Sequence, residues 1–467
     1  MLFTSYSFLF LFLPLFFLAY CCIPARARAS WILVGSYLFY GFWRFDFCLL
    51  LLAVTAVGFF GSILIDAKRS RSRFAAIVSV SLLLLLLGWF KYAGFIGDSW
   101  NGIANLLGWD SGKILVPDVI LPVGISFFTF QTLSYVVDVY RGLPPCRSFI
   151  SFAAYVSLFP QLVAGPIVRY TDVLGDLEKP RVTWKGIDHG VVIFMLGFCK
   201  KVWIANNVAP IADWMFSLHS PPLAVAWLGL AAYTIQIYFD FSGYSDMAIG
   251  LGLMMGFTFP ENFRAPYRSS SITEFWQRWH ITMSSFFRDY LYISMGGNRA
   301  GRMRTLLNLM ITMLLAGLWH GAGWTFVIWG GFHGLLLAVH RVWKTRTDMT
   351  SLGSHLWYRG FAIFVTLVLV MVGWVFFRAE SLSSVAVVFS GLIGVSGFGT
   401  EGLLQGRTDL VFWIVFGIAI ALVTFERTDR KWFLSSSAAK AILLVVFVGA
   451  VHELGGQAYN PFLYFQF

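Results

Sequence analysis

Long apolar runs recur along almost the whole chain and are separated by short polar loops. A helix of about 20 apolar residues crosses the roughly 30 Å hydrocarbon core of a bilayer. Several runs are shorter than that, so we expect some to be re-entrant or buried within a bundle. The pattern predicts an all-α polytopic membrane protein with about 11 transmembrane helices. The runs lie near residues 3–22, 30–43, 47–65, 74–90, 119–139, 151–168, 190–205, 222–239, 245–258, 306–330, 324–342, 361–377, 382–395, 410–425 and 438–451.

The composition supports a membrane fold. Hydrophobic residues make up 58% of the chain and charged residues only 12%, whereas soluble domains carry roughly 25% charged residues. A soluble fold of this size has too little interior for so much apolar surface, but a bilayer solvates it. The net charge of +11 comes from Lys and Arg in short loops, where they orient helices and attract anionic lipid. No basic stripe follows a phosphate backbone, so no nucleic-acid partner is expected.

The basic loops also predict an orientation. Arg26 and Arg28 follow the first apolar run, and a basic cluster at 68–73 follows the third. Two spans separate these loops, and Lys and Arg favour the cytoplasmic side, so both loops are expected there and the N-terminus in the periplasm. No basic residue precedes the first run and no small-residue cleavage site follows it. We therefore interpret this run as a retained helix and not as a signal peptide.

The segment 259–305 differs from the rest because it is semi-polar and rich in Trp, Arg, Tyr and Phe. Ser271 and Glu274 match a capping box, which predicts a helix from about 272 to 294 with Trp276 and His280 on one face. Such a helix is too charged to face lipid, so we expect it at the interface or along a wet cavity. The whole chain, 1–467, is expected to form a single integral membrane domain. In it, 259–305 is an interfacial or re-entrant segment leading to a catalytic helix around 306–330.

Motifs of soluble enzymes are missing from the sequence. It has no GxSxG, Walker or HExxH motif, and Gly250, Gly252 and Gly256 favour close helix packing over nucleotide binding. The five cysteines include no CxxC pair. We therefore expect no metal site, no disulfide framework and no bound cofactor.

His320 is the ionisable residue inside the apolar stretch 314–324. Ionisable groups inside a bilayer are costly, and they usually face a cavity or a partner. Glycines three residues before it, and one and three residues after it, are expected to thin the helix so that a substrate approaches the imidazole. Trp319 and Trp324 are expected to wall a tunnel. A desolvated, neutral imidazole suits a general base in acyl transfer; a structural histidine bonding across helices is the alternative.

His280 lies upstream of His320, where it either orients His320, binds a donor, or serves as an interfacial structural histidine. His333 and His340 share a helix but are expected on different faces, with His340 near the cytoplasmic end. The remaining histidines are interpreted as loop or interface residues. These are His189, His219, His355 and His452.

Two carboxylates and four hydroxyls interrupt an apolar stretch at Tyr238–Asp246. We expect Gly243 to break or bend the helix here. Buried polar groups need partners, so the run must line a cavity or form a network. A polar wall near an acyl-transfer site is the favoured interpretation, and a purely structural network is the alternative.

These segments resemble the membrane-bound O-acyltransferase (MBOAT) family, and within it the alginate O-acetylase branch. Matching motifs occur in order through nearly the whole chain, and it is their number and order that make the resemblance specific. The motifs are Leu121–Phe128, Leu162–Pro166, Tyr238–Asp246, Ser271–His280, Arg288–Ile293, Gly296–Arg299, Leu318–Gly321 and Tyr464–Phe467.

The resemblance implies the MBOAT fold, with shorter re-entrant helices among the transmembrane helices around a central funnel. It implies that His320 is the essential histidine of the family and His280 its second histidine. In such proteins an acyl thioester arrives from the cytosol, here expected to be acetyl-CoA, and the acetyl group leaves on the periplasmic side. A periplasmic or membrane-anchored acetyltransferase partner then passes it to the polymer.

Other side chains are expected to line the donor site or the tunnel, and a group of arginines is expected to hold the CoA phosphates at the cytoplasmic mouth. The lining residues are Tyr238, Asp240, Ser242, Asp246, Asn262, Trp276, Arg278, Asp289 and Trp319. The arginines are Arg264, Arg268, Arg278, Arg299, Arg302 and Arg304.

The sequence therefore predicts an acyltransferase that moves acetyl groups from cytosolic acetyl-CoA across the bacterial inner membrane, for O-acetylation of an exopolysaccharide. The branch does not fix the polymer, because close relatives look alike whether they serve alginate, acetylated cellulose or peptidoglycan. A somewhat shorter C-terminal third weakens alginate relative to cellulose, and both stay open. A non-enzymatic exporter or channel is one alternative, but no internal repeat or nucleotide site supports it. Transfer of D-alanyl groups from a carrier protein is the other, and it favours a hydrophobic docking surface over an arginine cluster.

Overall fold

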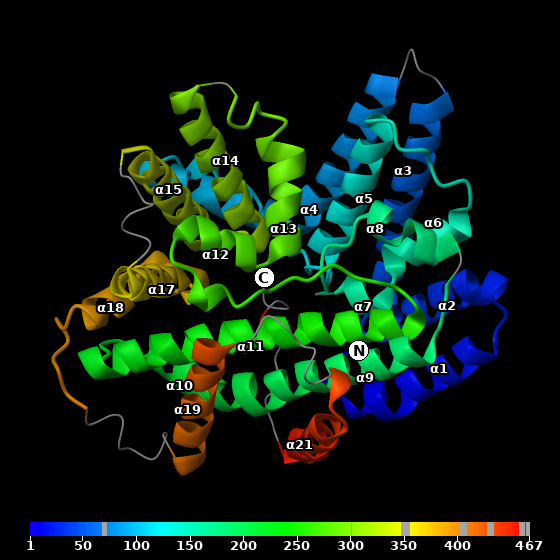
Figure 1. The fold of residues 1–467 in the computed structure, drawn as a ribbon. Coiled ribbons are helices and arrows are strands. Elements are labelled where there is room, and N and C mark those ends of the chain that lie inside the picture. The colour runs from blue at the N-terminus through cyan, green and yellow to red at the C-terminus, as the bar shows by residue number, and fades with distance from the viewer. Residues whose placement is uncertain are drawn as a thin grey trace. The chain divides into compact units, whose positions relative to one another are not determined.

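The computed structural model describes residues 1–67, 72–163, 165–178, 180–299, 301–346, 355–400, 409–426, 434–456 and 463. All regular elements in these ranges are helices (Figure 1), which confirms the all-α prediction. The chain divides into two compact units, residues 1–190 with 251–260 and residues 191–250 with 261–467. The motif Tyr464–Phe467, Ala164, and residues 68–71 of the basic loop lie outside the described residues.

Seven helices in the described ranges are long and apolar enough to cross a membrane. Three shorter apolar helices accompany them, Ser7–Cys22, Leu382–Leu392 and Leu410–Phe425. The chain is therefore a multi-pass membrane protein, as predicted, while the expected number of spans stays a prediction. The seven are Phe47–Asp66, Ser72–Leu106, Trp184–Ser217, Leu223–Met255, Trp324–Lys344, Leu356–Arg378 and Ser437–Gly456.

The first unit is built mainly from the N-terminal helices. In it α3, α4 and α5 pack against one another, and α2 packs against α6. Its elements are η1 (Ser7–Phe12), α1 (Leu13–Cys22), α2 (Arg28–Gly41), α3 (Phe47–Ala67), α4 (Ser72–Leu106), α5 (Ile125–Tyr140), α6 (Phe149–Ser157), α7 (Phe159–Leu162) and α8 (Tyr170–Glu178).

Two of the sequence motifs meet in this unit. Gly124 precedes α5 with a φ of 77°, a left-handed conformation that glycine adopts without steric cost. A Cβ at this position would collide with the backbone carbonyl oxygen of Leu162. The glycine of the first motif therefore lets the chain pass close to the start of the second.

The second unit contains the remaining helices, and α9 and α11 extend from it into the first unit. Within it α14 and α15 form a hairpin, α17 packs against α15, and α12 packs against both α15 and α17 (Figure 1). Its elements are α9 (Trp184–Cys199), η5 (Lys200–Ala205), α10 (Asn206–Ser217), α11 (Leu223–Met255), η6 (Pro266–Arg268), α12 (Ile272–Arg278), α13 (Ile281–Phe286), η7 (Phe287–Tyr292), α14 (Arg302–His320), α15 (Trp324–Arg346), α17 (Leu356–Arg378), α18 (Leu382–Leu392), α19 (Leu410–Phe425) and α21 (Ser437–Gly456).

The expected break at Gly243 is wrong, because α11 runs without interruption from Leu223 to Met255. Gly243 instead marks a close helix crossing. A Cβ on Gly243 would meet the carbonyl oxygen of Gly197, and a Cβ on Gly197 would meet that of Gly243. A helix tolerates an internal glycine at a cost of about 1 kcal/mol, and here the missing side chain lets α9 and α11 touch through their backbones.

The apolar run 306–330 forms two helices and not one. α14 ends at His320, Gly321 is extended, and α15 begins at Trp324. A Cβ on Gly317 would run into the Phe326 carbonyl oxygen, and a Cβ on Gly330 into that of Met313. Small residues on both helices therefore bring the hairpin arms together, as is common for helix pairs in membranes.

We predict that Gly243→Ala destabilises the protein by about 1–3 kcal/mol, because the added methyl group overpacks the crossing with Gly197. The measurement is the thermal unfolding midpoint of the purified chain in detergent. Gly417→Ala in α19 is the matched control, since a Cβ there meets nothing within 4 Å, and it should leave the midpoint unchanged or slightly higher. Equal midpoints for the two variants would contradict the crossing.

Candidate active site

His320 is the last residue of α14 and is 3% exposed. Aromatic rings surround its imidazole. The ring centroids of Trp319, Trp329 and Phe377 lie 4.9, 5.0 and 5.2 Å from that of His320. The ring of His280 lies 6.2 Å away, so the structure brings the two predicted histidines together in an enclosed, mostly apolar environment.

The expected helix over 272–294 is wrong, because the chain breaks between α12 and α13. Trp279 is extended, and His280 has a φ of 43° and a ψ of 55°. This left-handed conformation is uncommon for a residue with a side chain. Backbone strain of this kind persists only where surrounding contacts hold it. Trp276 and His280 therefore do not share a helix face.

Asn262 holds this break. Its side-chain oxygen accepts hydrogen bonds from the backbone N–H of Thr282 at 3.3 Å and from the Thr282 hydroxyl at 2.9 Å, and it lies 3.1 Å from Nδ1 of His280. Its backbone carbonyl accepts from the N–H of Ile281 at 2.9 Å, and the N–H of Arg264 donates to the carbonyl of Arg278. The segment 262–264 thus clamps the turn that presents His280.

The capping box is confirmed with a one-residue offset. The Ser271 hydroxyl accepts from the N–H of Glu274 at 3.2 Å, as predicted. The Glu274 carboxylate accepts from the N–H and hydroxyl of Ser270, both at 2.7 Å, and not from Ser271. Arg278 pairs with the same carboxylate at 2.6 Å.

The imidazole of His280 is fully buried, and this burial lowers its pKa from 6.5 to about 3. The ring is therefore neutral near pH 7 and carries one N–H. Because the Asn262 oxygen only accepts hydrogen bonds, Nδ1 carries this hydrogen and Nε2 carries the lone pair. The edge contact with Phe241, at 4.7 Å between centroids, fixes the ring plane.

Trp329 is a site residue that the sequence analysis missed. Its ring lies 5.0 Å from His320, 4.9 Å from His333 and 5.7 Å from Trp276. Trp276 and Trp319, both expected in the site, are buried. Trp329 follows the first residue of α15 by five positions. It precedes His333 by four residues, about one helical turn, and this spacing could have indicated that the two side chains lie together.

The expectation that His333 and His340 lie on different faces is wrong. Seven residues make almost two helical turns, so both side chains project from α15 toward α12. His333 contacts Trp276, with centroids 5.2 Å apart, and Nδ1 of His340 hydrogen-bonds to the Thr273 hydroxyl at 2.8 Å.

The space beside the glycines around His320 is occupied by other parts of the protein. The space beside Gly317 is filled by the backbone of Phe326, and the space beside Gly321 by the ring of Phe326. Gly323 also lies against that ring. These residues permit the hairpin to close, and the expected thinning of the helix is therefore wrong.

The polar run Tyr238–Asp246 lies in α11 and forms ion pairs with lysines. Asp240 pairs with Lys201 at 2.6 Å, and their side chains are only 1% and 2% exposed. Asp246 pairs with Lys200 at 2.9 Å. The N–H of Leu463 also donates to Asp240 at 2.9 Å. Two lysines within the apolar run 190–205 were a visible signal that the sequence analysis did not use.

Two of the other expected lining residues, Tyr238 and Asp289, have partners of their own. The Tyr238 hydroxyl donates to Glu426 at 2.5 Å, and its ring lies 6.1 Å from Trp279. Ser242 is buried. Asp289 pairs with its neighbour Arg288 at 2.7 Å.

Half of the six arginines bind groups of the protein itself. Arg264 pairs with Glu261 at 2.8 Å, Arg278 pairs with Glu274, and Arg268 donates to the Glu426 carbonyl at 2.7 Å. Arg299, Arg302 and Arg304 are exposed at or just before the start of α14. The described residues contain no group of three His, Cys, Asp or Glu side chains suited to a metal ion.

We predict that Lys201→Met destabilises the protein by about 3–5 kcal/mol, because it leaves the Asp240 carboxylate buried without its cation. Lys201→Met combined with Asp240→Asn should recover most of this loss. The thermal midpoint in detergent measures both. Asp46→Asn, which breaks the exposed pair with Arg44, is the control and should cost less than about 1 kcal/mol. A double variant as unstable as the single one would rule out charge burial as the cause.

We also predict that His280 makes the stability pH-dependent. Its pKa is lower in the folded protein than in the unfolded chain, so the unfolded state binds more protons between about pH 3 and 6.5. The contribution of His280 to the free energy of unfolding is therefore fully present above pH 6.5. It falls on acidification by up to about 1.4 kcal/mol per pH unit, because one proton is bound. Unfolding midpoints between pH 7.5 and 5 should fall less steeply in His280→Asn, since asparagine also tolerates the left-handed backbone. The control is His219→Asn at an exposed position, which should show the same change of unfolding midpoint with pH as the parent. If His280→Asn also shows the parent's change with pH, the prediction is wrong.

Known proteins are similar to this chain over all or part of its length. Residues 146–383 match the MBOAT, membrane-bound O-acyltransferase family. The chain is 42% identical to a probable alginate O-acetylase of Pseudomonas putida over 100% of both chains. It is 37% identical to a peptidoglycan O-acetyltransferase of Helicobacter pylori, over 85% of this chain and 80% of the other, and 29% identical to a teichoic acid D-alanyltransferase of Bacillus subtilis, over 55% and 69%. This multi-pass membrane protein therefore belongs to the membrane-bound O-acyltransferase family, in its alginate O-acetylase-like branch, and is an acyltransferase.

Proposed function

We propose that this protein takes acetyl groups from cytosolic acetyl-CoA and transfers them across the bacterial inner membrane for O-acetylation of an exopolysaccharide. The observation that carries the proposal is the buried pair of His320 and His280, with ring centroids 6.2 Å apart, in a chain of the acyltransferase family. Relatives named as O-acetylases or O-acetyltransferases cover most or all of the chain, which favours acetyl as the transferred group.

In this proposal His320 is the general base. Its neutral imidazole takes the proton of the acceptor hydroxyl as the oxygen attacks the thioester carbonyl. A carbon–oxygen bond forms and the carbon–sulfur bond breaks. The proton then passes from the imidazolium to the departing sulfur, so that the products are an ester and free CoA thiol. If His320 is instead a transient acyl carrier, its own nitrogen attacks the thioester and the hydroxyl attacks the resulting acyl-imidazole.

His280 supports this chemistry by position. With a pKa of about 3, its imidazole is a poor proton acceptor near neutral pH, because efficient general bases have pKa values near the working pH. Its neutral ring is oriented by Asn262 and Phe241. In this proposal the lone pair on its Nε2 is a hydrogen-bond acceptor held in a fixed direction near the reacting groups. Such preorganised groups stabilise a transition state without reorganising.

The aromatic rings around His320 supply a dry environment. Trp319, Trp329 and Phe377 lie within 5.2 Å of the imidazole, centroid to centroid. Excluding water strengthens electrostatic interactions and protects an acyl intermediate from hydrolysis. The α11 carboxylates are bound by Lys200 and Lys201. Three of the six arginines, Arg264, Arg268 and Arg278, bind other groups of the protein. We assign the carboxylates to structure and keep Arg299, Arg302 and Arg304 as the donor-phosphate group.

The donor, partner and polymer follow from the same proposal. Acetyl-CoA reaches the site from the cytosol, and a periplasmic or membrane-anchored acetyltransferase partner receives the acetyl group. Alginate and cellulose both fit as polymers, and full-length similarity to a probable alginate O-acetylase favours alginate. A carrier-protein donor for D-alanyl groups has weaker support, because that relative matches 55% of this chain at 29% identity. Membership of an acyltransferase family argues against a non-enzymatic exporter.

We predict that His320→Ala abolishes cleavage of labelled acetyl-CoA, by at least about 10²-fold, because the proton acceptor is lost. The assay uses the purified chain in proteoliposomes, with donor on the face that carries Arg26 and with partner and acceptor supplied. His452→Ala, in α21, is the control and should retain parent turnover. Survival of turnover in folded His320→Ala would remove this residue from the chemistry.

The same assay separates the two roles of His320. Denaturing the parent during turnover at neutral pH, where an acyl-imidazole survives longer than in acid, should leave no label on the protein if His320 is a base, and labelled protein if it is an acyl carrier. An absence of thioester cleavage in the parent itself would contradict acetyl-CoA as the donor.

A further inference from the structure

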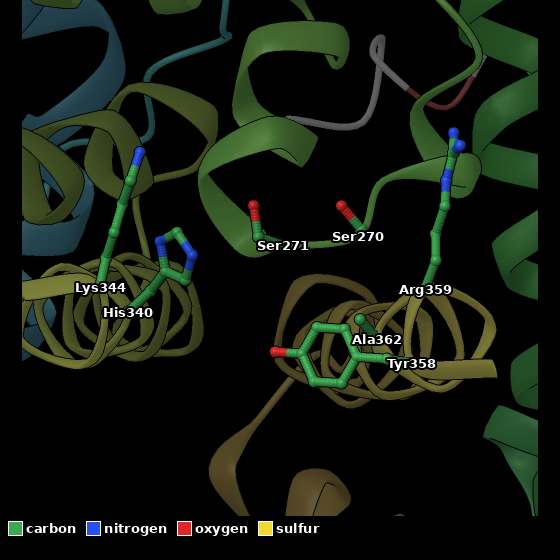
Figure 2. A pocket seen from close by; sticks show the side chains of 7 residues that line it. All are labelled: Ser270, Ser271, His340, Lys344, Tyr358, Arg359 and Ala362. Carbon is green, nitrogen blue, oxygen red and sulfur yellow. The ribbon is translucent and has the colours of Figure 1, made fainter. Parts of the chain in front are cut away.

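A cavity of about 400 Å³ lies in the second unit, apart from the histidine pair. Figure 2 shows how its walls come from three elements, the start of α12, the end of α15 and the start of α17. Its volume falls within the usual range for small-molecule sites. The lining residues are Ser270, Ser271, His340, Lys344, Tyr358, Arg359 and Ala362.

The cavity is lined by positive charge and by hydrogen-bond donors. Lys344 on α15 and Arg359 on α17 extend on opposite sides of the gap, while the Tyr358 hydroxyl points into it (Figure 2). His340 is held in place by the Thr273 hydroxyl, 2.8 Å from its Nδ1. Guanidinium, ammonium and hydroxyl groups, here carried by different helices, are the kinds of group that bind phosphate.

The nearest carboxylate in sequence does not oppose an anion here. Glu274 accepts two hydrogen bonds from Ser270 and forms an ion pair with Arg278. Burial acts to raise the pKa of Glu274, but these interactions outweigh it and lower the pKa below the usual value of 4.5. Its charge is thus balanced by Arg278, and the described lining of the cavity contains no acidic residue.

Exposed apolar side chains lie on the same two helices as the lining residues. Trp343 and Trp357, next in sequence to Lys344 and Tyr358, are 55% and 69% exposed. Val339 and Phe361 are also largely exposed. Tryptophan and tyrosine gather at the level of lipid headgroups, and α15 and α17 are both long enough to cross a membrane. The cavity therefore lies where these helices enter or leave the apolar layer.

We propose that this cavity binds the phosphate group of an anionic membrane phospholipid, held between Lys344 and Arg359, with its acyl chains against the exposed apolar side chains of α15 and α17. A phosphate group also occurs in the acetyl donor. The lipid is favoured because the cationic residues are next in sequence to, or two residues from, exposed tryptophans at the ends of two helices that are long enough to cross a membrane, an arrangement that a soluble donor does not need.

The cavity is connected to the histidine pair by the helix α12. Ser270 and Ser271 form its wall at the start of α12, and the same helix ends at the break that presents His280. A ligand that bridges α12, α15 and α17 stabilises the folded arrangement of these three helices. The proposal does not depend on the acetyl-transfer function.

The test titrates the full-length protein in neutral detergent with phosphatidylglycerol or phosphatidylcholine. The readouts are the thermal midpoint and bound lipid by native mass spectrometry. Phosphatidylglycerol should stabilise the parent more than phosphatidylcholine does. Lys344→Gln and Arg359→Gln should each weaken its binding by about tenfold, the typical cost of losing a charge-assisted contact. Arg341→Gln, which removes one charge from the same helix end outside the cavity, should bind phosphatidylglycerol as the parent does.

Equal binding of phosphatidylglycerol by the parent, Lys344→Gln and Arg341→Gln would overturn the proposal, and so would equal effects of the two lipids. In a separate arm without lipid, acetyl-CoA should stabilise the parent and Lys344→Gln equally. A loss of that effect in Lys344→Gln would assign the cavity to the donor phosphate and overturn the lipid. His320→Ala should keep its lipid binding, so a failure of the proposed chemistry is distinguishable from a failure of this site.

Discussion

The arrangement of the candidate site depends on the hydrogen bonds that Asn262 makes to the turn between α12 and α13. One side-chain oxygen contacts both His280 and Thr282, and the Asn262 backbone carbonyl accepts from Ile281. These contacts hold His280 in a left-handed conformation that a non-glycine residue rarely adopts. Without them the segment would favour one continuous helix, which would turn His280 away from its present neighbours. The strain is local and is offset by contacts gathered from a preceding loop.

Close helix packing places His320 opposite this turn. Gly317, Gly330 and Gly334 allow the arms of the α14–α15 hairpin to approach through their backbones, and His320 ends the first arm where the chain must reverse. The packing that fixes the hairpin thus also fixes the histidine. Trp329, on the returning arm, contacts both His320 and His333, so the aromatic lining of the site is part of the hairpin.

The charged side chains of α11 and η5 form ion pairs with each other. Lys201 and Asp240 are almost fully buried, and a single buried charge without its partner would be strongly destabilising. The neighbouring crossing of Gly197 and Gly243 brings η5 and α11 close enough for these pairs to form. The two carboxylates that were expected in a polar wall of the acyl site are therefore explained by their lysine partners. In the cavity at the start of α12 the balance differs, because the part of its lining that the structure describes carries cations and no acidic residue.

The sequence by itself determined the membrane class, the all-helical fold, the family and the two histidines that meet. The class and the helices follow from the length of the apolar runs, and the two histidines from side-chain chemistry, which are local properties of the chain. The family follows from the resemblance of its ordered motifs to those of membrane-bound O-acyltransferases. The sequence also predicted the cap at Ser271, since capping needs only neighbouring residues. Tertiary structure alone decided that α11 passes straight through Gly243, that the helix expected over 272–294 breaks at His280, and that Lys201 belongs to Asp240. In each case a contact with a segment distant in the sequence outweighs the local preference of the chain, and such contacts leave no regular spacing to read.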